Sequence, residues 1–149
     1  MGDIRTVMTN VVSLQEGLSI TSPVSASIKR AYKYMPPMSS ALPDCPCFIN
    51  SWTLAEQELD LGLRILFYTI NMQLAVDDSD QDQAADIASS FMNAFITAHN
   101  ADVQLGGSCN ITTLRGSDPT LAVLQWAGVS YIGLDLLLDV EIKDAVTIT

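Results

Sequence analysis

The amino-acid sequence predicts an α+β fold, in which a mainly antiparallel sheet of four to six strands packs against two helices. Residues 132–142 are the main reason, because aliphatic side chains recur there at every second position. A period of two sends successive side chains to opposite faces of a strand. Two other segments repeat their apolar residues at helical spacing. The predicted order is helix, two or three strands, helix, two or three strands.

The first helix is predicted near the N-terminus. Apolar side chains follow the i, i+3, i+4 spacing of an amphipathic helix from Ile4 to Leu18, and Gly17 marks the end of the helix. Residues 19–23 are expected to form a loop.

The first half of the sheet is predicted between residues 27 and 76. Residues 27–34 suit either a strand or a short helix, and Pro36-Pro37 end the segment in both cases. A Pro- and Ser-containing connection is expected over residues 38–46. Residues 47–54 alternate like a second strand, and residues 63–76 are apolar on both faces, as in a central strand covered on both sides.

The second helix is predicted from Ser79 to Asn100. Ser79 and Asp82 resemble a capping box, and aspartates favour the positive end of a helix dipole. Two turns and two extended segments then follow, and Gly128 and Gly133 mark expected bends or bulges in the last of these segments. The remaining elements are expected as turns at 106–107 and 116–119 and extended segments at 110–114 and 123–142.

Composition indicates one domain over residues 1–149, with 48% hydrophobic residues and only 16% charged residues. Soluble domains carry about 25% charged residues, so part of this surface is expected to be covered by a partner. The formal net charge of −10 excludes a protein that binds nucleic acid by gripping its phosphates, since that needs a basic face.

The charges are unevenly distributed along the chain. A basic cluster lies near residue 30, and a run of acids without a cation lies near residue 80. Opposite local fields favour head-to-tail contact between copies. The predicted subunit or ring contacts are Lys29, Arg30 and Lys33, and the predicted opposing surface consists of Asp77, Asp78, Asp80 and Asp82.

No catalytic, cofactor-binding or metal-binding residue is predicted. His99 is the single histidine, and no nucleophile-elbow sequence accompanies it. A zinc site from Cys45, Cys47, Cys109 and His99 lacks the usual two-residue spacer between cysteines. An EF-hand beginning at Asp78 lacks both the glycine and the final glutamate. The chain is therefore expected to be a structural protein and not an enzyme.

The compartment is expected to be a reducing one. The chain opens without a secretory signal, no apolar run is long enough to span a bilayer, and three cysteines are too few and too close to form a disulfide framework. Assembly in the cytoplasm, without a membrane, fits these observations.

One part of the chain resembles a known family. The stretch Ile-Lys-Arg-Ala-Tyr-Lys-Tyr-Met-Pro-Pro at residues 28–37, then Leu42-Pro43 and the extended residues 47–52, is similar to the early part of tail terminator (tail completion) proteins of long, non-contractile-tailed, lambda-like phages. The order of the later elements also resembles that family: a long strand, an Asp-rich turn, a helix and a closing strand pair.

The resemblance implies a strand at residues 27–34 and a homo-hexameric ring located in the virion. Such a ring caps the tail tube, stops addition of the major tail tube protein and docks to a head–neck connector or stopper protein. DNA passes through its lumen without specific binding, which a net charge of −10 suits, and the aspartates near residue 80 are candidates for the lumenal surface. The alternatives are another neck ring protein, an adaptor with an exposed strand edge, and a small enzyme or ligand-binding domain using Trp52, Tyr68 and Trp126.

Overall fold

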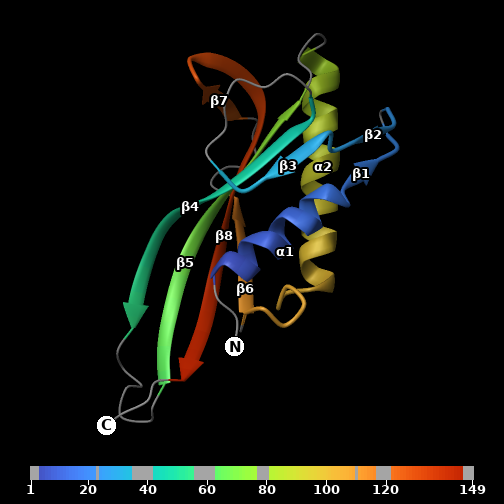
Figure 1. Ribbon diagram of the computed structural model, residues 1–149. Helices are drawn as coiled ribbons and strands as arrows, with labels where there is room; N and C mark the ends of the chain where they lie inside the picture. The colour runs from blue at the N-terminus through green and yellow to red at the C-terminus, as the bar shows by residue number, and fades with distance from the viewer. Residues whose placement is uncertain are drawn as a thin grey trace.

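The computed structural model describes residues 4–22, 24–34, 42–55, 63–76, 81–109, 111–116 and 122–145. Its fold is α+β with a mainly antiparallel sheet and two helices, as the sequence predicts. The helices are α1 (Ile4–Glu16) and α2 (Gln81–Ala101), and the strands are β1 (Ser19–Ile20), β2 (Ala26–Ser27), β3 (Arg30–Tyr32), β4 (Asp44–Ala55), β5 (Leu63–Val76), β6 (Ile111–Gly116), β7 (Ala122–Trp126) and β8 (Val129–Ala145). Both helices lie on the same face of the large sheet (Figure 1).

The large sheet is built around β5 and β8. Its strand order is β3-β4-β5-β8-β6, with β7 also paired to β8, and only the β3–β4 pair is parallel. β8 pairs with β5 from Ile132 to Ala145, and its other edge pairs first with β7 and then with β6. The short strands β1 and β2 form a separate antiparallel hairpin.

Three element boundaries differ from the prediction. β1 lies in the expected loop, because a two-residue strand is too short to show a period. β4 begins at Asp44, inside the expected connection, since its first residues pair with β3. The last extended segment is divided by a turn at Ala127 and Gly128, where φ is positive at both residues, as in the tight turns that join β-hairpins. Pro36-Pro37 and Ser79 lie outside the described residues.

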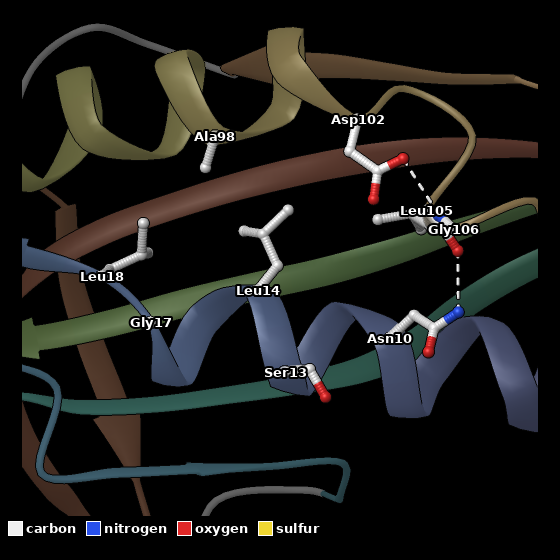
Figure 2. A pocket seen from close by; sticks show the side chains of 9 residues that line it. All are labelled: Asn10, Ser13, Leu14, Gly17, Leu18, Ala98, Asp102, Leu105 and Gly106. Atoms are coloured by element: carbon white, nitrogen blue, oxygen red, sulfur yellow. Dashed lines mark hydrogen bonds between the residues drawn. The ribbon is translucent and has the colours of Figure 1, made fainter.

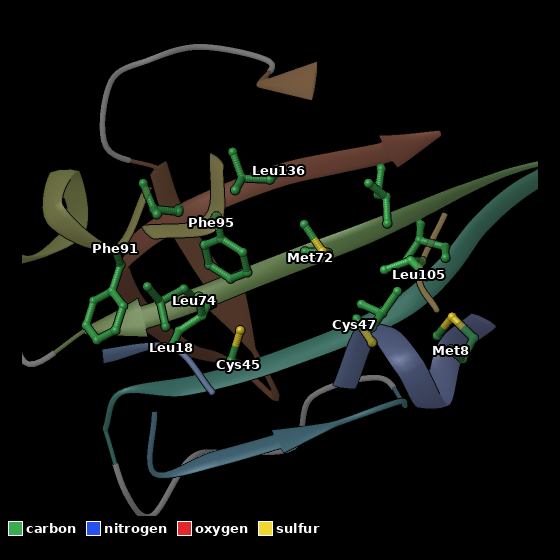
Figure 3. Close-up of a cluster of buried hydrophobic side chains, with 14 of the residues drawn as sticks. Met8, Leu18, Cys45, Cys47, Met72, Leu74, Phe91, Phe95, Leu105 and Leu136 are labelled. Carbon is green, nitrogen blue, oxygen red and sulfur yellow. The ribbon is translucent and has the colours of Figure 1, made fainter. Parts of the chain in front are cut away.

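The hydrophobic core lies between the helices and one face of the sheet (Figure 3). The buried side of α1 supplies Val7, Met8 and Val11, as its spacing predicts. α2 contributes Phe91 and Phe95, which are both buried. The sheet supplies every second residue of β5 and β8, so the alternation seen in the sequence separates core from outer face. These sheet residues include Ile70, Met72, Leu74, Leu134, Leu136, Leu138, Val140 and Ile142.

The prediction that β5 is covered on both sides is wrong. Phe67, on the face away from the helices, is 43% exposed. That outer face is covered near Ala75, where the β7–β8 hairpin bends over it and buries Trp126. The indole Nε1 of Trp126 donates a hydrogen bond to Gln73 Oε1 at 2.8 Å. The outer face of β5 is therefore covered by the β7–β8 hairpin near Ala75 and exposed at Phe67.

Gly133 lies where β8 comes closest to β5. A Cβ atom built on this residue would lie 1.6 Å from the Leu74 carbonyl oxygen and 3.0 Å from Ala75 Cα. These are backbone atoms of the central strand, so relief would need a shift of the sheet itself. The predicted bend at Gly133 is therefore a close approach between two backbones that only glycine permits.

We expect Gly133→Ala to lower the free energy of unfolding by about 3 kcal/mol, because the methyl group forces the β5 and β8 backbones apart. Urea unfolding followed by circular dichroism measures this loss. Gly17→Ala is the matched control, since an added Cβ there meets no atom closer than 3.6 Å. Equal stability of the two variants would contradict the close backbone approach assigned to Gly133.

Candidate interaction surfaces

One edge of the large sheet is open. β4 pairs with β3 only from Asp44 to Pro46, so Cys47 to Ala55 have no strand neighbour on that side among the described strands. This stretch contains no charged residue, proline or glycine. Native proteins usually protect a sheet edge with such residues or cover it, because its free N–H and C=O groups pair readily with another chain.

Large apolar side chains are exposed around this edge. Trp52 is 63% exposed and Ile49 is 43% exposed on β4. On the outer face, Phe67 of β5 and Ile111 of β6 flank the same β8 residue, Glu141, and Ile111 is 46% exposed. In Figure 1 the ends of β4, β5 and β8 run on beyond both helices as a projecting ribbon.

The opposite edge is closed at Thr112 of β6. The Thr112 backbone N–H donates to the Val103 carbonyl oxygen at 2.9 Å, and its hydroxyl donates to the same oxygen at 2.7 Å. Because the hydroxyl proton is engaged in the bond to Val103, Thr112 Oγ1 accepts a hydrogen bond from His99 Nε2 at 2.8 Å. His99 therefore carries a proton on Nε2 and ties the last turn of α2 to β6.

The basic cluster predicted near residue 30 does not form one patch. Lys29 lines a crevice with Val24 and Gln83, beside the start of α2. Arg30 binds Asp44 within the chain. Lys33 donates through Nζ to Thr9 Oγ1 at 3.2 Å. The three side chains diverge because β3 ends between Arg30 and Lys33.

Arg30 and Asp44 form an ion pair that holds the start of β4 against β3. Arg30 Nη2 lies 2.9 Å from Asp44 Oδ2, and Arg30 Nε lies 3.2 Å from Asp44 Oδ1. Tyr32 donates its hydroxyl to Asp44 Oδ2 at 3.2 Å, and the guanidinium lies 4.5 Å from the centre of the Tyr32 ring. The hydrogen bond to Asp44 raises the pKa of Arg30, and burial raises the pKa of Tyr32.

Sequence reasoning did not single out Asp44, although a signal was present. Asp44 is the only acidic residue between Glu16 and Glu56, and it follows the basic cluster. Its side chain is fully buried, so its charge needs a partner inside the protein. The parallel pairing of β3 with β4 places Arg30 directly beside it.

Of the acidic candidates, Asp82 is exposed in the first turn of α2. Asp77, Asp78 and Asp80 lie outside the described residues.

A groove with a volume of about 560 Å³ lies between α1 and the end of α2. In Figure 2, Asn10 and Asp102 point at the backbone of the loop after α2, and Ser13 points away from that loop. Asn10 Nδ2 donates to the Leu105 carbonyl oxygen at 2.7 Å, and Asp102 Oδ1 accepts from Gly106 N at 3.0 Å. The groove therefore stabilises the loop after α2 and has no convergent polar groups for a small molecule.

A second groove lies at the beginning of α1, beside the open edge of β4, with a volume of about 370 Å³. We call it the α1–β4 groove. It is lined by Ile4, Arg5, Met8, Lys33, Phe48 and Ile49.

The three cysteines are buried free thiols. Burial raises the pKa of Cys47 to about 12 and that of Cys109 to about 11, and it raises the pKa of Cys45 well above its ordinary value. In the part of the chain that the structure describes, no three His, Cys, Asp or Glu side chains are grouped to hold a metal ion.

No protein-family model matches the chain, and no curated protein matches it. Neither described helix is both long enough and apolar enough to cross a membrane.

We expect Arg30→Met to lower the free energy of unfolding by about 3 kcal/mol, because it leaves the buried Asp44 carboxylate without its cation. Adding Asp44→Asn should recover part of that loss. Urea unfolding at pH 7 measures both effects. Removal of the exposed Arg115–Asp139 pair by Asp139→Asn is the control and should cost much less. Unchanged stability of Arg30→Met would contradict this account of the pair.

We expect the free energy of unfolding to fall as the pH rises from about 9 to about 11. The folded thiols keep their protons in this range, whereas exposed thiols with an ordinary pKa of 9.0 release theirs, so the unfolded state gains stability. Urea unfolding at pH 7, 9, 10 and 11 tests this. Cys109→Ala should flatten the decline, and a constant stability across the range would contradict it.

Proposed function

We propose that the chain is a structural ring subunit of the phage tail terminator kind. In this role, six copies cap the tail tube, stop addition of the major tail tube protein and provide the docking surface for a head–neck connector protein in the virion. DNA passes through the ring without specific binding. The observation that carries the proposal is the open, uncharged edge of β4 with Trp52 exposed beside it.

The open edge favours self-association because it combines two kinds of contact. Its backbone groups are available for pairing with another strand, and Ile49 and Trp52 of the same strand offer exposed apolar area. Aromatic side chains are enriched at the centres of protein interfaces. An exposed surface of this kind is costly in water unless a partner covers it.

The order of elements also supports the proposal. The chain has a helix, a short strand that leads into a sheet, a long central strand, a second helix and a long closing strand. This is the order in the family that residues 28–37 resemble. Within that segment Arg30–Tyr32 form β3, so the strand that the resemblance implies at residues 27–34 is present over three residues.

The overall charge suits a ring through which DNA moves. A net charge of −10 repels phosphate, so DNA is not retained by the lumen wall. The described grooves are open at the surface, and in the groove between α1 and the end of α2 the side chains of Asn10 and Asp102 are already hydrogen-bonded within the chain. These features suit an assembly protein better than a protein that binds a small molecule.

We expect the purified chain to form ring-shaped particles that are visible by electron microscopy and that contain six copies by light scattering. Added to growing tail tubes, it should stop their elongation and bind to their ends. Trp52→Ser should weaken assembly while leaving the circular dichroism spectrum unchanged, because the side chain is largely exposed. A 16.1 kDa monomer at high protein concentration would contradict the proposal.

A further inference from the structure

The α1–β4 groove combines an apolar floor with a cationic rim. Ile4, Met8 and Ile49 supply apolar surface, while Arg5 and Lys33 line the same groove. Lys33 Nζ contacts the neutral hydroxyl of Thr9. In a protein with a net charge of −10, a groove of this character attracts an apolar side chain that is accompanied by acids.

The β1–β2 hairpin has the complementary character. Val24, between its two strands, is 37% exposed. The hairpin is held against α2 by Ser90 Oγ, which donates to the Ser22 carbonyl oxygen at 2.8 Å. Asp82 and Asp86 are exposed on the first turns of the same helix. Lys29 also lines the crevice beneath the hairpin, but its single positive charge is outnumbered by the two carboxylates of Asp82 and Asp86.

The groove and the hairpin lie at opposite ends of α1. The groove includes Ile4, the first residue of the helix, and β1 begins three positions after its last residue. The helix has 13 residues, so the two surfaces are separated by about 20 Å. Figure 1 shows the hairpin and the start of α2 at the far end of α1 from the groove.

We propose that the α1–β4 groove of one copy receives the Val24 end of the β1–β2 hairpin of a second copy. The occupant is another copy of this chain, since the chain itself carries the exposed Val24 of the hairpin next to the acids Asp82 and Asp86 of α2, which match the apolar floor and cationic rim of the groove. Two different surfaces at opposite ends of one helix make a head-to-tail contact, which repeats from copy to copy and closes into a ring when the rotation allows. The inference rests on the proposed ring function and names its contact.

A mixing experiment tests the head-to-tail geometry. Lys33→Glu alters only the groove and Val24→Glu alters only the hairpin, and each should weaken self-association at least about tenfold. Alone, each variant should remain at 16.1 kDa by light scattering. Mixed together they should form a dimer of about twice that mass, because the intact hairpin of one variant fits the intact groove of the other.

Val123→Glu is the matched control. Val123 is 70% exposed on β7, away from both surfaces, so this variant should assemble like the unmodified chain. Circular dichroism and melting temperature should be the same for all three variants. Assembly of Lys33→Glu or Val24→Glu at unmodified strength would overturn the inference and leave the ring proposal standing. A mixture that stays monomeric would also overturn it, and an unmodified chain that never assembles would overturn both.

Discussion

Along its whole length β5 pairs with β8; β4, β6 and β7 each pair with one of these two, and β3 attaches to the sheet through β4. The pairing sets which side chains of both strands face the helices, because directly opposed residues point to the same face. A slip of one residue would move the whole apolar set from the core to the outer face. The glycine at the closest approach of the two backbones is part of the same constraint.

The two faces and the two edges of this sheet are treated differently. The helices cover one face except at the projecting ends of β4, β5 and β8 (Figure 1), whereas the other face is covered where Trp126 packs over Ala75 and is exposed at Phe67. One edge is tied to α2 through His99 and Thr112, and the other is open along most of β4. Exposed apolar side chains gather at the open edge and on the uncovered face. Among the described surfaces, the open edge and the uncovered face are therefore the parts best suited to contact with another chain.

Most of the fold could be predicted from the sequence, because single segments keep a regular spacing of apolar residues that identifies a strand or a helix. The alternation at residues 132–142 and the helical spacing at Val7 and Val11 are local signals of this kind. The turn at Ala127 was missed, since turns with two positive φ values usually carry asparagine or glycine at the first position and alanine gives no such signal. The two-residue strands were missed because they are shorter than any period.

The candidate surfaces were harder to predict, because they depend on contacts between distant segments. Lys29, Arg30 and Lys33 are neighbours in sequence, yet their side chains go to α2, to Asp44 and to α1. The apolar residue Phe67 led to the prediction of a covered face on β5, and sequence cannot show that no described element covers that side chain. The α1–β4 groove is lined by residues of α1, of β4 and of the segment after β3, so no single stretch of sequence predicts it.

The clamp between His99 and Thr112 has a consequence for how far association can spread. A sheet with two open edges can add molecules at both sides without limit and so grow into a fibre. Here the Val103 carbonyl and the His99 side chain occupy Thr112 of β6, so an added strand cannot pair with the sheet at this position of the far edge. The contact that ties the last turn of α2 to β6 thereby removes one pairing position from the edge opposite β4.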